Sequence, residues 1–383
     1  MYIKKLKLKN YRNYEEVEVD FDKKINIIYG DNAVGKTNLL ESIYMCSTSK
    51  SHRNVKENDI INFNKEEAHI KLIYVKDREE KNQTIDIQLN KDSKKGIAKN
   101  GIKVEKISDF LGELNVILFS PEDLNIIKDG PQVRRKFLNV EISQIDRIYV
   151  SLIQNYNKIL NQRNALLKDI HKEVGNNRDY LISMLDTYDE QISKYGMEVI
   201  KKRKENIKKI AEKIINIHLL ISDKKEKLIV DYENDILEND SEKEISENYD
   251  YFLDKYLKKI KETREIDIKN QYTMIGPHRD DISFFIDEKD IRKFGSQGQK
   301  KTAGISLKLS ELDILKEKIN ETPVLLLDDV FSELDESRQK LLVKNIVDIQ
   351  TIITCTGIKK NVFDLLKPEK VLKVSDNKII EKG

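Results

Sequence analysis

The sequence has only two cysteines, Cys46 and Cys355, and neither lies in a pattern with metal-ligand spacing. The five histidines are scattered as well, so neither a disulfide framework nor a zinc site is expected. No stretch approaches the roughly 18 apolar residues of a membrane span, and the N-terminal MYIKKLKLKN lacks the apolar run of a signal peptide. These absences predict a soluble, cytoplasmic protein without a membrane partner, whose cysteines are reduced and packed.

A strong excess of one charge is also missing. The 69 basic and 67 acidic residues leave a net charge of +2, so composition alone does not indicate a nucleic-acid binder. Any DNA-binding surface must come from local clusters of lysine and arginine. The chain of 383 residues is long enough for about two domains.

Both ends of the chain show the patterns of strands and short helices. Alternating apolar and polar residues predict strands at about 3–8, 17–21 and 25–29, and a helical apolar pattern begins at Leu39. Further strands are predicted at about 68–76, 83–90, 115–119, 282–286, 324–327 and 351–353. Asn100-Gly101 is typical of a two-residue hairpin.

In the middle of the chain the apolar residues recur at the spacing of helices and not of strands. Apolar residues at helical spacing predict one amphipathic helix from about 141 to 160 and a longer one over 180–221, separated by the polar segment 172–177. A third helix is predicted from Ser241 to Thr263. The middle is therefore interpreted as a helical insertion in an α/β chain whose two ends form one domain.

The segment YGDNAVGKTNLL contains a glycine, four residues, and then Gly-Lys-Thr, between a predicted strand and a predicted helix. In such a loop the backbone N–H groups converge on phosphate oxygens, the lysine reaches the β- and γ-phosphates, and the hydroxyl ligates Mg²⁺. The pattern predicts ATP and Mg²⁺ as cofactors. The residues predicted to bind ATP here are Gly30, Asn32, Gly35, Lys36, Thr37 and Asn38.

A phosphate loop that hydrolyses a nucleotide also needs an acidic residue after a second buried strand. The apolar run 324–327 is followed by Asp328 and Asp329. Asp328 is the candidate Mg²⁺ residue together with Thr37, and Asp329 is the candidate catalytic base. The Asn-Lys-x-Asp segment of GTPases is missing, because no Asn-Lys pair is followed by Asp at the required place. The long separation of the two motifs points instead to ABC-type head ATPases.

ABC-type heads need a third element, a turn rich in serine and glycine at a helix N-terminus, which completes the ATP site of a second subunit. Ser296, Gln297, Gly298 and Gln299 precede a predicted helix over 302–315 and lie shortly before the acidic strand. A helix N-terminus of this composition can bind an anion. We predict that this signature segment acts in trans, in an ATP-dependent homodimer.

The whole chain resembles the bacterial RecF family of recombination-repair ATPases, which are related to the heads of structural-maintenance-of-chromosomes proteins but lack their long coiled coil. The resemblance covers residues 8 to 335 in the order of that family. The segments that carry it are 8–14, 30–37, 50–53, 119–124, 134–138, 275–281, 296–299 and 327–335.

The resemblance implies an ABC-type α/β head formed by 1–118 and 270–383, with an antiparallel β-rich part, and a mainly helical lobe with a helical hairpin at 119–269. It implies that Ser296 meets the γ-phosphate of the partner subunit and that Arg12 lies near the nucleotide phosphates. The loop along the dimer seam would be Ser332, Glu333, Leu334 and Asp335. It also implies cooperation with RecO and RecR, with RecA recombinase downstream.

Two departures from the wider ABC pattern predict slow hydrolysis. The usual glutamate after the acidic strand is Asp329, which is one methylene shorter, and the expected histidine after the next strand is Thr354. We place no counterpart of the glutamine loop. ATP is therefore expected to hold the dimer together, and its slow hydrolysis, stimulated by DNA, to release it.

Two basic clusters are candidates for contact with the DNA backbone, which would be salt-sensitive and independent of sequence. The candidate DNA-binding residues are Lys201, Lys202, Arg203, Lys204, Lys94 and Lys95. The alternative is that the first cluster is only a solvated helix face. His52, Arg53, His278 and Arg279 are either site residues or loop-packing groups, and the functional reading is favoured for Arg279.

The function that we expect from the sequence is an ATP-dependent clamp on double-stranded or gapped DNA in recombinational repair. One alternative is a nuclease of the OLD type, which would need an acidic metal-binding domain after the head, and few residues follow Asp329. Another is the ATPase subunit of a transporter. The Gly-Pro-His-Arg-Asp-Asp segment and the helical insertion argue against a transporter.

Overall fold

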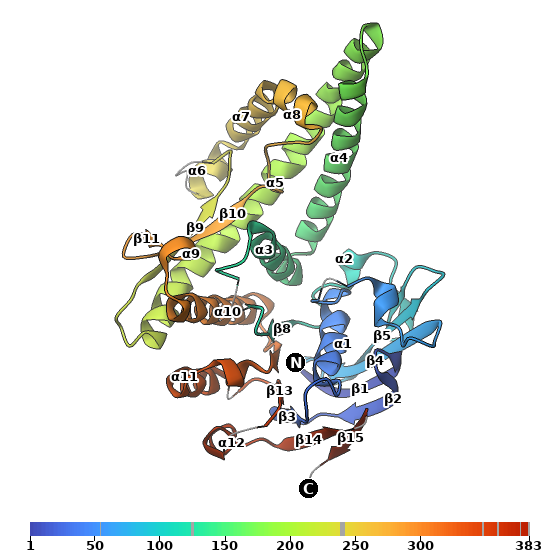
Figure 1. Ribbon diagram of the computed structural model, residues 1–383, viewed down its shortest axis with the longest axis vertical. Helices are drawn as coiled ribbons and strands as arrows, with labels where there is room; N and C mark the ends of the chain where they lie inside the picture. Colours follow the sequence, from blue (N-terminus) through green and yellow to red (C-terminus); the bar gives the residue numbers. More distant parts are fainter. Residues whose placement is uncertain are drawn as a thin grey trace. The chain divides into compact units, whose positions relative to one another are not determined.

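A computed structural model describes residues 1–53, 55–123, 126–237, 242–346, 348–357, 360–375 and 377–381. It divides into two compact units. The first comprises Met1–Asn125, Leu220–Lys224 and Gly304–Gly383, and the second Ile126–Leu219 and Lys225–Ala303. Each combines helices and strands, which confirms the predicted α/β class (Figure 1).

The first unit contains two six-stranded sheets. One has the order β2-β1-β4-β5-β6-β7 and is antiparallel throughout. Its strands are β1 (Tyr2–Tyr11), β2 (Tyr14–Asp20), β4 (Glu67–Val75), β5 (Asn82–Asn90), β6 (Gly96–Lys99) and β7 (Ile102–Lys103). Asn100 and Gly101 both have positive φ between β6 and β7, so the predicted two-residue hairpin is confirmed.

The other sheet has the order β15-β14-β3-β13-β12-β8, and it is parallel except for β15. Its strands are β3 (Ile25–Tyr29), β8 (Val116–Phe119), β12 (Val324–Asp328), β13 (Thr351–Cys355), β14 (Lys370–Ser375) and β15 (Lys378–Glu381). Every residue of β8, β12 and β13 is buried. Unbroken apolar runs form such strands because helices or sheets cover both faces of a parallel sheet.

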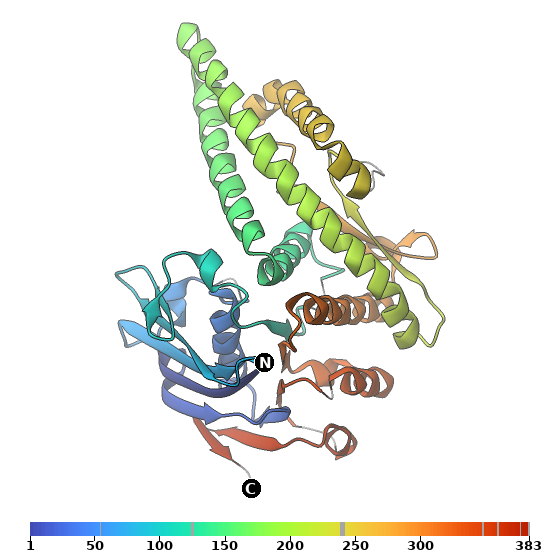
Figure 2. The same cartoon turned by 180° about the vertical axis from the view of Figure 1, so that it is seen from behind.

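Helix α1 (Lys36–Thr48) is surrounded by both sheets. It contacts β4 and β5 of the antiparallel sheet and β8, β12 and β13 of the parallel one (Figures 1 and 2). Ten of its 13 residues are buried for that reason. The remaining helices of this unit are η1 (Glu57–Ile60), α2 (Ile107–Phe110), η3 (Val330–Glu333), α11 (Glu336–Ile346) and α12 (Lys360–Leu366). Both cysteines are buried and free, as predicted.

The second unit is built around a helical hairpin. Helices α4 (Arg147–Lys172) and α5 (Asn176–Ile221) run side by side in both views (Figures 1 and 2). The other elements are α3 (Pro131–Ile145), β9 (Leu228–Glu233), α6 (Glu242–Glu247), α7 (Tyr249–Glu262), α8 (Arg264–Asn270), β10 (Asp281–Ile286), β11 (Lys289–Asp290) and α9 (Ile291–Phe294). Strand β10 pairs with β9 and β11. Helix α10 (Gln297–Ile319) contributes residues to both units.

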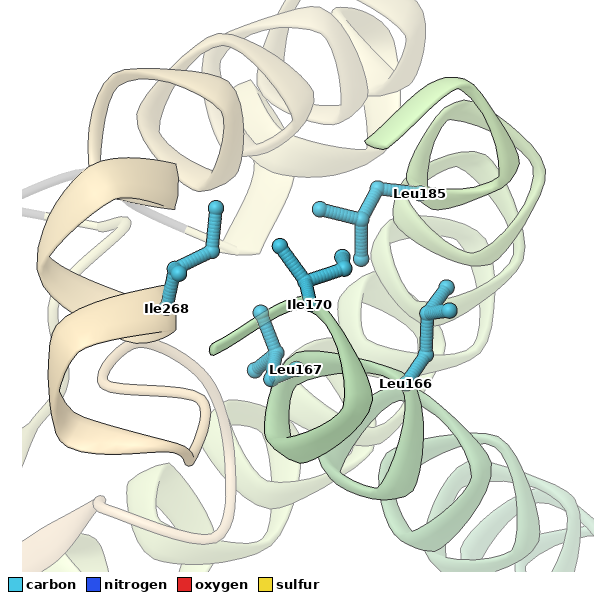
Figure 3. Packing of buried hydrophobic residues seen from close by; sticks show 5 residues of the cluster. All are labelled: Leu166, Leu167, Ile170, Leu185 and Ile268. Atoms are coloured by element: carbon cyan, nitrogen blue, oxygen red, sulfur yellow. The ribbon is translucent and has the colours of Figure 1, made fainter. Parts of the chain in front are cut away.

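An apolar cluster joins three helices of the hairpin region. Figure 3 shows Leu166, Leu167 and Ile170 of α4, Leu185 of α5 and Ile268 of α8 directed toward one another. Burying side chains of this size contributes about 1.5–3 kcal/mol each. Next to it, Arg163 is fully buried between Asp189 and Asp267, both at 2.7 Å. The hairpin is thus fixed by apolar packing and by paired charges.

Two helices differ from the sequence predictions. The helix expected from about 141 is two helices, because Asp146 leaves the helical conformation and caps α4 by accepting from the N–H groups of Ile148 and Tyr149. The third helix is divided into α6 and α7, and its predicted start, Ser241, lies outside the described residues. Leu124, the last residue of the resemblance segment 119–124, also lies outside them. The predicted head and helical lobe, with bounds at 118/119 and 269/270, stay a prediction. The compact units divide at 125/126 and 303/304, with Leu220–Lys224 in the first unit, and β10 pairs with β9 in the second.

Candidate functional site

The loop between β3 and α1 requires its two glycines. Gly35 has φ of 106°, and a Cβ there would lie 2.5 Å from Nδ2 of Asn13 and 2.7 Å from the hydroxyl of Tyr14. A Cβ on Gly30 would lie 2.4 Å from the carbonyl oxygen of Val374. The loop is therefore closed against the β1–β2 turn on one side and β14 on the other, and only glycine fits at both positions.

Lys36 is held inside this loop. Its side chain is buried (8% exposed), and Nζ donates to the carbonyl oxygens of Gly30 at 2.8 Å and Asp31 at 2.6 Å. In the described part of the chain no carboxylate forms an ion pair with it. The ammonium group is thus positioned by neutral oxygens, which leaves its charge available to a phosphate.

Asp328 joins the acidic strand to the loop. It is the last residue of β12, where Thr37 Oγ1 donates to its Oδ1 at 2.9 Å. The hydroxyl of Thr354, the residue opposite Asp328 on β13, donates to the same oxygen at 2.6 Å. The structure therefore brings together the two residues predicted to hold Mg²⁺. It also places Thr354 within β13, not after it, as the support of Asp328.

The oxygen set suits the predicted metal. Mg²⁺ prefers oxygen ligands, and in phosphate-loop proteins it is bound by one or two protein oxygens together with waters and substrate phosphates. The Thr37 hydroxyl and the Asp328 carboxylate supply these two oxygens on the wall of one pocket. Thr37 and Asp328 are therefore the residues that would hold the ion.

Asp329 follows in a left-handed conformation, with φ of 52°. Its N–H donates to the carbonyl oxygen of Thr354 at 3.1 Å and to the Thr354 hydroxyl at 3.2 Å. Burial raises the pKa of Asp329 above that of an ordinary aspartate, and the neighbouring charge of Asp328 adds to the increase. A carboxylate with a raised pKa is a better proton acceptor, which suits the predicted role of base.

These residues line a pocket of about 290 Å³. Its walls are Asn32, Ala33, Gly35, Lys36, Thr37, Asn38, Arg53, Asp328 and Asp329. Seven of the eight nucleotide-site residues predicted in the loop and the acidic strand, all but Gly30, therefore line one pocket. Arg53, which the sequence left undecided, belongs to it too, and its Nη1 donates to Asn38 Oδ1 at 3.0 Å.

Arg12 lies elsewhere in the same unit. Its Nε and Nη2 donate to the buried carboxylate of Glu41 at 2.9 and 2.7 Å, and its Nη1 donates to the carbonyl oxygen of Asp59 at 2.9 Å. It is not among the residues that line the pocket. Contact of Arg12 with phosphate stays a prediction, while Arg53 is the arginine that the pocket contains.

Asn13 is a site residue that the sequence reasoning missed. Its Nδ2 donates to the carbonyl oxygen of Val34 at 3.1 Å, and its Oδ1 accepts from Asn38 Nδ2 at 2.7 Å. It thereby supports the phosphate loop from the β1–β2 turn. The sequence contained one indication of this role, since Asn13 lies in the resemblance segment 8–14. No spacing rule, however, connects the β1–β2 turn to a loop about 20 residues later in the chain.

The signature segment forms the start of α10 in the second unit. The Ser296 N–H donates to Gln299 Oε1 at 2.8 Å, and the Gln299 N–H donates to Ser296 Oγ at 3.2 Å. This reciprocal pair is a capping box, which fixes the serine at the helix N-terminus. The predicted helix thus begins at Gln297, five residues earlier than expected. The role of Gln297, Gly298 and Gln299 in a second copy stays a prediction.

The predicted seam loop, residues 332–335, comprises the last two residues of η3 and the two residues that connect it to α11. Ser332 Oγ donates to the carbonyl oxygen of Asp329 at 2.6 Å, so the loop is attached to the candidate base. Asp335 caps α11 by accepting from Arg338 N–H at 3.0 Å. Leu334 is buried, whereas Ser332, Glu333 and Asp335 are exposed and available to a partner surface.

The segment that follows β8 is a further loop at the edge of the parallel sheet, and no counterpart of the glutamine loop is assigned to it. Strand β8 pairs with β12 in parallel, so the segment that follows β8 lies at the same edge as Asp328. This segment is 120–123, where the Ser120 N–H and hydroxyl both donate to Asp123 Oδ2 at 2.8 Å.

The structure corrects one DNA-binding prediction. Arg203 is 2% exposed, and its Nη1 donates to Asp280 Oδ2 at 2.9 Å and to the Pro277 carbonyl oxygen at 2.5 Å. It cannot contact DNA, because its face of α5 packs into the second unit. The run of basic residues at 201–204 predicts one positive surface. A helix that packs on one side, however, directs every third or fourth residue toward the core.

The other basic candidates keep some exposure. Lys202 pairs with Asp146 at 2.8 Å, and Lys95 pairs with Glu57. Lys201 lies over the Tyr249 ring, 5.9 Å from its centroid. Lys204 is half-buried and Lys94 is exposed. Their contact with DNA stays a prediction.

The two candidate histidines pack within loops. The ring of His52 lies edge-on to Tyr44, and burial lowers its pKa. His278 Nε2 donates to the Thr273 carbonyl oxygen at 2.9 Å, which leaves Nδ1 to accept from the Tyr156 hydroxyl at 2.6 Å. Burial lowers the pKa of His278 to about 4, and the charges of Arg279, Arg135 and Arg203 contribute.

This histidine predicts a pH-dependent loss of stability. Its folded pKa lies below the ordinary value of about 6.5, so the unfolded chain binds a proton first and the free energy of unfolding falls as pH decreases from 6.5 toward 4. We expect this group to cost about 2 kcal/mol between pH 6.5 and 5. Urea unfolding at both pH values should show this loss, and His278→Gln should reduce it. The exposed His171→Gln is the control, and an unchanged loss in His278→Gln would contradict the assignment.

Known proteins resemble the chain over its whole length. The family model for the RecF/RecN/SMC N terminal domain matches residues 2–381. The DNA replication and repair protein RecF of Lachnospira eligens is 47% identical over 383 residues, and that of Clostridium tetani is 44% identical, each with 100% of both chains covered.

Solved structures agree with these relatives. The recombination mediator protein RecF-ATP in the RecFOR pathway superimposes with a TM-score of 0.91 at 34% identity, covering 100% of this chain and 98% of the other. The Smc head domain from Pyrococcus furiosus gives a TM-score of 0.55 at 16% identity, covering 100% and 96%, and shares the fold.

Proposed function

The chain belongs to the RecF/RecN/SMC N-terminal domain family and, within it, to the RecF proteins of DNA replication and repair, and from this premise we propose that it is an ATP-dependent clamp on DNA. ATP binds in the pocket of the first unit and joins two copies around duplex DNA near a gap. Hydrolysis, weak and stimulated by DNA, then releases them.

The observation that carries this proposal is the convergence of Lys36, Thr37 and Asp328 in one pocket. The Lys36 ammonium is directed into the loop by two carbonyl oxygens, so it is poised for the β- and γ-phosphates. Asp328 and Thr37 would hold Mg²⁺, and the bound ion would neutralise charge that develops on the phosphate oxygens. Asp329 orients the attacking water and accepts its proton.

Slow hydrolysis follows from two features of the same pocket. Asp329 reaches one methylene less far than a glutamate would, so its carboxylate is a less well-placed base. The Thr354 hydroxyl is already committed to Asp328 at 2.6 Å. Neither residue replaces the histidine that ABC-type enzymes have after the strand equivalent to β13. ATP is therefore hydrolysed slowly and stays bound long enough to hold the dimer together.

The dimer completes each ATP site. Ser296 of one copy, fixed by its capping box, presents its hydroxyl and the N-terminus of α10 to the γ-phosphate bound by the other copy. The exposed residues of 332–335 lie along the seam. RecO and RecR are the proposed partners in the same pathway, with RecA loaded downstream, in the cytoplasm. Within the described residues, no helix has the length and apolarity to cross a membrane.

Ser296→Arg tests the composite site. The variant should bind ATP in its own pocket but remain a monomer, because the larger side chain replaces the γ-phosphate contact in trans. Light scattering would measure dimerisation, and anisotropy of a labelled gapped duplex would measure DNA binding, each with and without ATP. Ser93→Arg, at an exposed loop residue of the first unit, is the matched control.

Mixing variants makes this test sharper. An equimolar mixture of Lys36→Met and Ser296→Arg can form a dimer in which one site carries both changes and the other carries neither. ATP-dependent dimerisation should therefore return in the mixture although each variant alone fails. If ATP changes neither dimerisation nor duplex binding of the wild type, the clamp proposal is wrong. If Ser296→Arg dimerises normally, only the role in trans is wrong.

A further inference from the structure

The turn that precedes β10 presents an arginine for which the described residues supply no acidic partner. Arg279 is exposed, and in the described residues its side chain makes no hydrogen bond or ion pair, although two aspartates follow it directly in the sequence. Only its backbone N–H is used, and this donates to the Gly276 carbonyl oxygen at 2.8 Å. An arginine next to two aspartates in the sequence can pair with either of them, but Arg279 pairs with neither in the described structure.

The neighbouring carboxylates are occupied by other cations. Asp280 is buried, where it accepts from Arg203 at 2.9 Å and from the Tyr232 hydroxyl. Asp281 accepts from Arg134 Nη2 at 3.0 Å and from Arg292 Nη1 at 2.9 Å. Both carboxylates thus have other partners, and within the described residues neither forms an ion pair with Arg279.

The turn itself is rigid. His278 is fixed at both ring nitrogens, and Gly276 has φ of 131° in a space where a Cβ would lie 2.2 Å from the Tyr256 hydroxyl and 2.6 Å from the Tyr156 hydroxyl. Arg279 thus extends from a fixed backbone. A cation held in this way loses less conformational freedom on binding a ligand than one on a mobile loop.

A second guanidinium group lies next to the first. Arg135 of α3 is half-buried, and its Nη1 donates to the Asp280 carbonyl oxygen at 2.7 Å, one residue from Arg279. Burial lowers the pKa of Arg135, and the positive charges of Arg203 and Arg279 contribute to the decrease. No carboxylate in the described part of the chain forms an ion pair with Arg135. Two like charges therefore lie close in the chain, and among the described residues neither forms an ion pair with a carboxylate, although Asp280 and Asp281 are near enough to Arg135 to raise its pKa.

We propose that Arg279 and Arg135 form a contact site for the phosphodiester backbone of duplex DNA. The proposal rests on the function proposed above and assigns part of its DNA surface. Guanidinium groups bind phosphate oxygens through paired hydrogen bonds, and two adjacent cations match a ligand with one negative charge per nucleotide. Because the contact is to phosphate and not to base edges, it adds affinity equally on all sequences.

The test compares Arg279→Gln, Arg279→Lys and Arg135→Lys with the wild type. Anisotropy of labelled duplexes of two unrelated sequences would be followed with ATP between 50 and 250 mM salt, values chosen to span the steep part of the salt dependence. Arg279→Gln should weaken binding to both by roughly 5- to 10-fold and reduce the slope of log K against log salt by about 1. Arg279→Lys should keep the slope, because the charge remains.

Arg78→Gln is the charge-matched control. Arg78 is an exposed arginine of the first unit, whose side chain donates to the Asn320 carbonyl oxygen, and its loss should leave the slope unchanged. Light scattering with ATP, run on every variant, separates DNA contact from dimerisation. Free inorganic phosphate should compete only at concentrations far above those of duplex, since it presents one phosphate rather than a spaced array.

The outcomes separate this inference from the proposed function. If wild type binds duplex with ATP and folded, dimeric Arg279→Gln binds it with the same affinity and slope, the phosphate contact is wrong and the clamp stands. If Arg279→Gln loses ATP-dependent dimerisation, Arg279 belongs to the dimer contact and the inference is also wrong. If the wild type dimerises with ATP but does not bind duplex DNA, both the DNA clamp and the phosphate contact of Arg279 and Arg135 are wrong.

Discussion

Replacing Lys36 with methionine is expected to reduce ATP turnover by roughly 10³-fold and to abolish ATP-dependent dimerisation. Methionine keeps much of the length of the side chain and its burial but removes the one lysine among the described residues that line the pocket. The phosphate charge then lacks its fixed counter-charge in a site where most water is excluded, and such losses are large. Phosphate release at saturating ATP and equilibrium nucleotide binding would measure the two parts of the effect.

The control for this variant is Lys56→Met. Lys56 is an exposed lysine of the same unit that does not line the pocket, so turnover should stay close to that of the wild type. Thermal unfolding of both variants would verify that folding is retained, because within the described residues the Lys36 side chain makes two hydrogen bonds, both to backbone carbonyl oxygens. Turnover within a few-fold of the wild type in Lys36→Met would exclude the phosphate-binding role.

Arg203→Met is expected to destabilise the protein by about 3–5 kcal/mol and not to act as a DNA-binding variant. The change leaves the buried Asp280 carboxylate without its cation, and it also removes donors to the Pro277 carbonyl oxygen and to Asn139 Oδ1. An uncompensated buried charge is among the few defects with effects of this size. Urea unfolding would measure the loss.

A second change should relieve part of this loss. Combining Arg203→Met with Asp280→Asn removes the uncompensated charge, and the two effects should therefore be non-additive by about 1–3 kcal/mol. Lys204→Met, one residue along the same helix and half-buried, is the control and should change stability by no more than about 0.5 kcal/mol. A fully stable Arg203→Met with weakened DNA binding would reverse our correction and restore the surface role predicted from sequence.

Several elements were predictable because one local pattern decides each of them. The strands near 25–29 and 324–327 are unbroken apolar runs, and such runs become buried strands of a parallel sheet. The hairpin at Asn100-Gly101 follows from two residues that tolerate positive φ. The break at 172–177 between the two long helices was visible as a polar segment with a glycine. In these cases the neighbouring residues contain all the information that is needed.

Other elements depended on partners far away in the chain. The capping of α4 by Asp146 divides a helix that the apolar spacing shows as continuous. Strand β10 joins the second unit because it pairs with β9, some 50 residues earlier, and no local pattern expresses that pairing. Arg203 is basic like its neighbours, and only the position of Asp280 reveals that it faces inward.

The sequence by itself determined the α/β class, the phosphate loop, the acidic strand and the signature segment, because each is a short pattern whose chemistry is contained in consecutive residues. The tertiary structure decided which of these meet. It placed Thr354 beside Asp328, added Arg53 and Asn13 to the phosphate loop and removed Arg203 from the surface. It also left Arg279 without an acidic partner among the described residues. Such distinctions arise from pairing and burial between residues that are far apart in the sequence. Residue type alone does not determine whether a charged side chain forms an ion pair inside the protein or stays available to bind a ligand.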